Sequence, residues 1–155
     1  MNFFRSFNQK LLSLNAFDFL ILLSIRLYLA FVFWFAGYGK IVWQNGSPNI
    51  DRFAEFLGPG GQDNLNFILP YFFGWLAIFA EAGGAIFLLV GLFSRWVALP
   101  LIFTMIVAAY YHWPNGWNAD ASGVEMSVTY LVLLFTILIF GPGKYFSFDY
   151  WVLRK

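Results

Sequence analysis

The sequence contains no cysteine, a single histidine and few charged residues. The absence of cysteine excludes disulfides and iron-sulfur clusters, and one histidine is too few for a bis-histidine haem within this chain. Any redox chemistry must therefore use a cofactor from outside the chain. A tight metal site is not expected either, because such sites need three or four protein ligands. A net charge of +1 gives no reason to expect nucleic acid as a partner.

Charged residues make up only 11% of the chain, whereas 61% are hydrophobic and 23% aromatic, with a mean hydropathy of +0.69. Four apolar runs, at 17–39, 70–92, 96–113 and 124–140, are long enough to cross a hydrocarbon layer as helices. Because short connections make neighbouring helices antiparallel, we expect an all-α fold, an integral membrane four-helix up-down bundle that forms one transmembrane domain over 1–155. Short interfacial helices are expected at 3–14 and 49–57, the second with Phe53, Phe56 and Leu57 facing inward.

Loop charges predict the orientation of this bundle. With the N-terminus in the cytoplasm, six basic residues lie on the cytoplasmic side and two on the other. The six are Arg5, Lys10, Arg95, Lys144, Arg154 and Lys155, and the two are Lys40 and Arg52. We therefore expect a multi-pass protein with both termini in the cytoplasm.

Two ionisable residues interrupt the apolar runs near their midpoints, Arg26 in the first and Glu81 in the second. Charges at the centre of a bilayer are costly and are usually paired or functional. Since the two helices are expected to be antiparallel neighbours, we predict an intramembrane ion pair between Arg26 and Glu81. Such a pair either holds the bundle together or serves a proton-linked or polar ligand site.

A second group of polar residues is expected at the outer mouth of the bundle. Lys40 ends the first run, His112 ends the third and Glu125 begins the fourth, and the aromatic residues nearby include Tyr38, Tyr111 and Trp113. A quinone headgroup suits such a pocket, because its carbonyls accept hydrogen bonds from Lys40 or His112 while aromatic walls stack against the ring. The alternative for His112 is an interfacial histidine bonded to the backbone or to water.

Several segments, in order along the chain, resemble the DoxX family. They are RLYLAFVFWFAGYGK from Arg26 to Lys40, EAGG from Glu81, LLVGLFSR ending at Arg95, the residues His112 and Glu125, and GPGKYFSFD ending at Asp149. The resemblance implies a small four-helix protein of the bacterial inner membrane that is associated with oxidoreductase systems. The family includes a quinone-reactive subunit of thiosulfate oxidation and membrane partners of oxidative-stress proteins.

The segment HWPNGWNADASG at 112–123 is further similar to DoxX-like proteins that accompany copper-binding bufferin peptides. Carried over position by position, the polar pattern of the family falls on Arg26, Lys40, Glu81, His112 and Glu125. These are the five residues that were picked out above by their depth.

Two functions remain open from the sequence. The first is an accessory subunit of a membrane oxidoreductase, rather than a stand-alone enzyme, which has no intrinsic cofactor and binds a quinone in an outward-facing polar pocket. The second is a non-catalytic scaffold that docks a partner protein of a membrane complex through the aromatic surface around Trp113, Pro114 and Trp117. Both functions imply contact with membrane lipid. A small transporter is less favoured, because there are too few helices for an inverted repeat.

Overall fold

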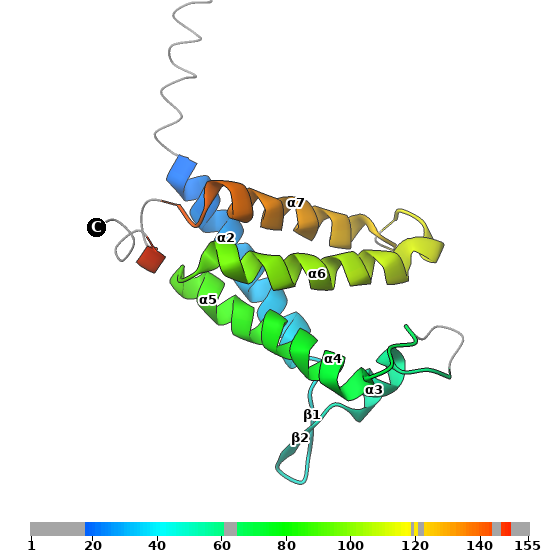
Figure 1. Cartoon of the computed structure of the whole chain (residues 1–155). Coiled ribbons are helices and arrows are strands. Elements are labelled where there is room, and N and C mark those ends of the chain that lie inside the picture. Colours follow the sequence, from blue (N-terminus) through cyan, green and yellow to red (C-terminus); the bar gives the residue numbers. More distant parts are fainter. Residues whose placement is uncertain (1–17, 61–64, 119, 121–122, 144–146, 150–155) are drawn as a thin grey trace, which may run out of the picture.

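The structure is a computed structural model that describes residues 18–60, 65–118, 120, 123–143 and 147–149 (Figure 1). The described part is mostly helical. Its helices are α2 (Asp18–Tyr38), α3 (Asp51–Leu57), α4 (Pro70–Ile78), the π-helix η2 (Phe79–Gly83), α5 (Gly84–Val90), α6 (Ser94–His112), the 3-10 helix η3 (Trp113–Asn115) and α7 (Glu125–Phe140). The expected helix at 3–14 lies outside the described residues. The long helices begin and end within two residues of the four apolar runs.

Three helical segments are long and apolar enough to cross a membrane, namely Phe19–Tyr38, Pro70–Val90 and Ser94–Asn115. The second of these is α4, η2 and α5 in unbroken succession, and Glu125–Phe140 is a shorter apolar helix. Only 22% to 33% of each span is buried inside the protein, so most of its apolar side chains face outward. An apolar surface of this extent is favourable against lipid tails and unfavourable in water, so the described helices are typical of a membrane protein.

The hydrophobic core occupies one half of the bundle. Its buried residues come from α2, α5, α6 and α7, and they are Leu29, Ala30, Phe33, Ala85, Leu88, Ala98, Leu101, Ile102, Met105, Leu134 and Ile137. None of them belongs to α4. We call this half, which includes the turn at Gly91, the Gly91 end, and the opposite half, where α2 stops, the Lys40 end. The core therefore holds the helices together at the Gly91 end, whereas α4, at the Lys40 end, lies outside this core.

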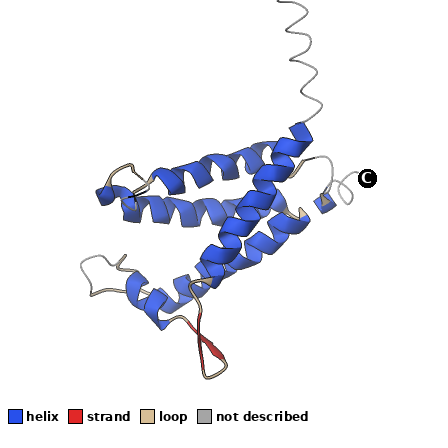
Figure 2. Ribbon diagram, turned by 180° about the vertical axis from the view of Figure 1, so that it is seen from behind, coloured by secondary structure: helices blue, strands red, loops and turns tan. Residues whose placement is uncertain are grey.

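A β-hairpin follows α2 at the Lys40 end and projects away from the helices (Figures 1 and 2). Its strands β1 (Val42–Gln44) and β2 (Ser47–Asn49) pair antiparallel, with Val42 opposite Asn49. The turn between them contains Asn45 and Gly46 with φ of 50° and 79°. Two positive φ values are typical of the type I′ turn that Asn-Gly favours. The all-α expectation therefore missed this hairpin, although the Asn-Gly signal is present in the sequence.

The segment 147–149 lies against the turn between α5 and α6. The carboxylate of Asp149 accepts hydrogen bonds from the backbone N–H groups of Phe93 (2.7 Å) and Ser94 (3.0 Å). The backbone N–H of Asp149 and the hydroxyl of Ser147 both donate to the carbonyl of Gly91, each at 3.0 Å. Asp149 thus caps the first turn of α6, where N–H groups have no helical partner.

Candidate functional site

Arg26 lies at the Gly91 end and does not pair with Glu81. Its side chain is only 1% exposed, and Nη1 donates a hydrogen bond to the carbonyl of Pro142 at 3.1 Å. The carboxylate of Glu81 forms its ion pair with the ammonium of Lys40 instead. The predicted Arg26 to Glu81 pair is therefore wrong.

The register between α2 and the α4–α5 rod explains this difference. Arg26 faces Gly91, while Gly37 faces Glu81 and Ala82. A Cβ added to Gly37 would lie 2.6 Å from the backbone nitrogen of Ala82 and 3.0 Å from the Cβ of Glu81. The ten residues from Glu81 to Gly91 correspond to a rise of about 15 Å. Arg26 and Glu81 therefore lie at different depths, although each is near the middle of its own apolar run.

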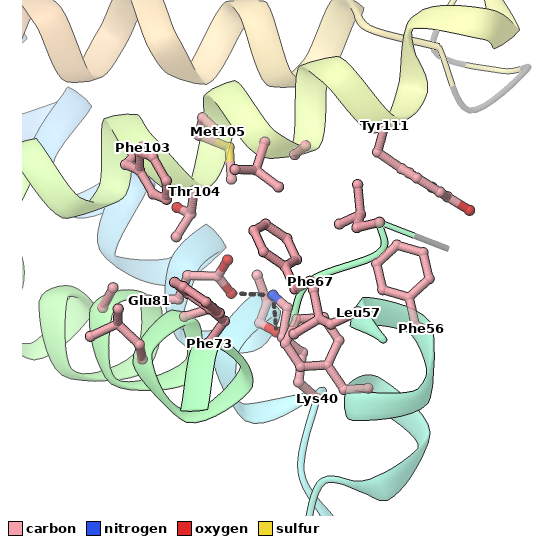
Figure 3. Close-up of a pocket in the computed structure, with 18 of the residues that line it drawn as sticks. Lys40, Phe56, Leu57, Phe67, Phe73, Glu81, Phe103, Thr104, Met105 and Tyr111 are labelled. Carbon is pink, nitrogen blue, oxygen red and sulfur yellow. Dashed lines mark hydrogen bonds and ion pairs between the residues drawn. The ribbon is translucent and has the colours of Figure 1, made fainter. Parts of the chain in front are cut away.

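The ion pair of Lys40 and Glu81 holds the end of α2 against η2 (Figure 3). The ammonium of Lys40 also donates to the carbonyl of Ala36 at 3.2 Å and lies 5.3 Å from the centroid of the Phe53 ring. The side chain of Glu81 is 4% exposed and that of Lys40 is 23% exposed. The two charges compensate each other in a largely apolar setting, where an isolated charge would be costly.

Glu81 is the central residue of the π-helix η2. A π-turn inserts one extra residue into the helix, and π-turns often occur at functional sites. Two small residues that follow, Ala82 and Gly84, let the helix approach its neighbours closely, Ala82 facing Gly37 of α2 and Gly84 facing Val97 and Leu101 of α6. The extra residue and the small side chains together place a carboxylate on the buried face toward α2.

Beside this ion pair lies a cavity of about 370 Å³ (Figure 3). It is bounded by the end of α2, by α3 and the segment after it, by α4 and η2, and by one face of α6. Its lining is Ala36, Lys40, Phe53, Phe56, Leu57, Leu65, Phe67, Phe73, Leu76, Ala77, Ala80, Glu81, Pro100, Phe103, Thr104, Met105, Val107, Ala108, Tyr111 and His112. The volume and the mostly apolar lining with a few polar groups are typical of ligand pockets.

The structure brings three of the six predicted pocket residues to this cavity, Lys40, Tyr111 and His112. The other three lie elsewhere. Tyr38 stacks against Trp34 on the exposed side of α2, and Trp113 is exposed in η3. Glu125 begins α7, which packs against α6 and α2 and contributes nothing to the lining.

The aromatic wall of the cavity was missed from the sequence. It consists largely of Phe53 and Phe56 from α3, Phe67 from the following segment and Phe73 from α4. The rings of Phe67 and Phe73 have centroids 4.9 Å apart. The inward spacing in 49–57 was a signal for the α3 residues, but nothing in the sequence places that helix over a cavity.

His112 is the last residue of α6 and lines the cavity beside Tyr111. Its Nδ1 atom is buried and has no hydrogen-bond partner among the described residues. Buried polar atoms are normally satisfied, so an unpaired one invites a ligand or a water molecule. The ring of Tyr111 makes edge contacts with His112 (4.9 Å between centroids) and with Phe56 (4.7 Å).

The polar groups of the cavity can both donate and accept hydrogen bonds. An ammonium carries only donors, a carboxylate only acceptors, and a neutral imidazole one of each. Such a set can hold a flat ring with carbonyl oxygens and also the same ring with hydroxyl groups. Within the part of the chain that the structure describes, no group of three or more potential metal ligands gathers.

Comparison with known proteins identifies the family of this chain. Neither the curated proteins nor the solved structures give a match. The DoxX family model matches residues 21–113, more than half of the sequence, including Lys40, Glu81 and His112. This protein therefore belongs to the DoxX family.

Proposed function

We propose that this DoxX-family membrane protein is an accessory subunit of a membrane oxidoreductase and that it binds a quinone in the cavity beside Lys40 and Glu81. The observation that carries the proposal is an aromatic-walled cavity of about 370 Å³ whose lining includes the polar side chains of Lys40, Glu81, Tyr111 and His112. The partner would supply the electrons, since this chain has no cysteine and one histidine.

The chemistry of a quinone matches these groups in both redox states. An oxidised quinone has two carbonyls, which accept from the ammonium of Lys40 or from an imidazole N–H. After two electrons from the partner and two protons have been added, the quinol has two hydroxyl groups, which donate to the carboxylate of Glu81 or to an unprotonated imidazole nitrogen. The unpaired Nδ1 of His112 supports this assignment. Aromatic side chains such as Phe67 and Phe73 offer surfaces for the ring.

In this proposal the chain crosses the bacterial inner membrane four times, with both termini in the cytoplasm. The excess of arginine and lysine near the termini and at Arg95 supports that orientation. The Lys40 end of the bundle, with the β-hairpin and α3, then faces the periplasm.

Binding can be tested in lipid nanodiscs with a matched pair of variants. Val107 lines the cavity, whereas its neighbour Ile106 does not and is exposed. We expect Val107→Trp to fill the cavity and weaken quinone binding by about tenfold or more, a loss of about 1.4 kcal/mol. Ile106→Trp introduces the same side chain outside the cavity and should leave binding unchanged. Equal affinity of both variants and the unmodified protein contradicts the proposal.

A scaffold function is the second candidate, favoured by the exposed indoles of Trp113, in the 3-10 helix η3, and of Trp117, two residues after it. Interface hot spots are rich in tryptophan, and a docked partner would bury both rings. Replacing both by serine should release a co-purifying protein without affecting quinone binding. If the partner stays bound, the scaffold candidate loses its support.

A further inference from the structure

The helices that form the cavity diverge toward the Lys40 end. The α4–α5 rod meets α6 through α5 and η2, while α4 itself has no substantial packing against α6. All core residues of α6 lie in its first twelve residues, from Ser94 to Met105, and α4 contributes none. The rod and α6 thus form a wedge that is closed by packing at the Gly91 end, as Figure 1 shows.

One side and the outer end of this wedge are covered. The helix α2 crosses behind it and packs on α5, η2 and α7 (Figures 1 and 2), and it supplies Ala36 and Lys40 to the cavity wall. The outer end is covered by α3, whose Phe56 contacts Tyr111 of α6 with the rings at 84° to each other. The contact between Phe56 and Tyr111 therefore narrows this end of the wedge.

The side of the wedge opposite α2 has an exposed apolar rim. Leu76 on α4 and Phe103 on α6 both line the cavity, yet they are 51% and 57% exposed. Pro100 on α6 also lines the cavity and is exposed. Phe103 lies nine residues before His112, a rise of about 13 Å along α6. This rim is therefore at the depth of the hydrocarbon layer.

We infer that the ligand enters from the lipid, between α4 and α6, and that it is a quinone with a long isoprenoid tail. The polar groups of Lys40 and Glu81 lie on the side of α2 and hold the headgroup, while the tail leaves past Leu76 and Phe103 into the bilayer. This inference rests on the proposed quinone function and specifies the class of quinone. An apolar rim without charge is compatible with a tail that never has to enter water.

Two photoreactive quinones can test the route in nanodiscs containing the full chain. One carries an azide on the ring, and the other carries a diazirine on the tail close to the ring. After illumination, labelled peptides are mapped by mass spectrometry, with and without an excess of unlabelled long-tailed quinone. Labelling of Ile139 on α7, which is exposed and does not line the cavity, serves as the control for nonspecific contact from lipid.

We expect the ring probe to label residues near Lys40 or His112 and the tail probe to label Leu76 or Phe103, both suppressed by competitor. If the ring probe labels the cavity but the tail probe labels α3 or the hairpin, entry from lipid is wrong and the proposed function still holds. If the competitor suppresses neither probe's labelling, both the route and the proposed function are overturned.

Discussion

At the scale of single residues, Lys40 and Glu81 each compensate the charge of the other, so the contribution of one to stability depends on the presence of the other. Removing one partner of a buried ion pair leaves an uncompensated charge, which costs about 3 kcal/mol or more. We therefore predict that Lys40→Met and Glu81→Gln each lower the melting temperature of the detergent-solubilised protein. The double variant should recover much of the loss, because neither charge then remains alone. Thermal melts of the four proteins form a double-mutant cycle, and simple additivity of the two losses would rule out the pair as a stabilising unit.

His112 should matter for ligand binding more than for folding. Its Nδ1 has no hydrogen-bond partner among the described residues, so the folded protein gains little from the imidazole. His112→Phe keeps a ring and removes the polar atoms, and a lost hydrogen bond corresponds to a weakening of quinone binding of about tenfold. Tyr110→Phe, at an exposed neighbour that does not line the cavity, is the control. A quinone titration that gives both variants the same affinity would remove His112 from the site.

The predicted ion pair between Arg26 and Glu81 was wrong because the position of a residue in its own helix does not determine its neighbour on another helix. Each residue is near the middle of its own apolar run, but the sequence does not give the register between the two helices, which decides whether the residues share a depth and can pair. The connection from Gly39 to Leu69 is long and leaves that register free. The three residues between α5 and α6, in contrast, fix how those two helices meet. The signal for the true register was Gly37, the small residue that admits Glu81.

At the scale of elements, the contact between α2 and η2 depends on a glycine. A Cβ at position 37 would lie 2.6 Å from a backbone nitrogen, so Gly37→Ala must push the helices apart at a cost of about 1–3 kcal/mol. Gly83→Ala meets nothing within 4 Å and should be neutral or stabilising by about 0.5–1 kcal/mol, as for any open helical glycine. Opposite shifts of the melting temperature are expected. Equal shifts would mean that α2 and η2 are not in close contact.

The cap of α6 gives a second prediction at this scale. Asp149 accepts from Phe93 N and Ser94 N, so Asp149→Ala should destabilise the protein by about 1 kcal/mol, as the loss of a helix cap does. Asp120→Ala, at an exposed residue between α6 and α7, should change stability by less than about 0.5 kcal/mol. Chemical unfolding monitored by circular dichroism compares the two. A result in which Asp120→Ala costs as much as Asp149→Ala contradicts the cap.

Helices were easier to anticipate than the remaining elements. Long apolar runs gave α2, α6 and α7 nearly to the residue, because apolar length determines a membrane helix. The π-turn at Glu81 has no comparable pattern in the sequence. It lies beside two small residues that contact neighbouring helices, Ala82 against Gly37 of α2 and Gly84 against Val97 and Leu101 of α6. The hairpin did have a signal in Asn45 and Gly46, which was outweighed by the expectation of an all-helical bundle.

At the scale of the whole molecule, the proposed orientation can be tested by cysteine labelling, because the natural chain has no cysteine. Ser47→Cys lies in the exposed hairpin, and Lys155→Cys is at the last residue of the sequence. In cells with a permeable outer membrane, a membrane-impermeant maleimide should label Ser47→Cys at once. It should label Lys155→Cys only after the inner membrane has been opened. The reverse order would invert the proposed topology.

The wedge shape of the molecule could not be predicted from the sequence. Apolar runs say how long the helices are, but not where they separate. That point is set by the core, which packs Leu29, Leu88, Leu101 and Leu134 at the Gly91 end and leaves α4 outside. The sequence did indicate that Lys40 and His112 lie on the same side of the bundle, because each follows or ends an apolar run there, and both residues line the cavity.

The most direct test of the quinone site is a density map of the protein purified in its own membrane lipid. We predict ring-shaped density in the cavity between Lys40 and His112, continuing as a chain past Leu76 and Phe103 into the lipid. A cavity that holds only water, or one filled by side chains that have closed the gap between α4 and α6, would contradict the account.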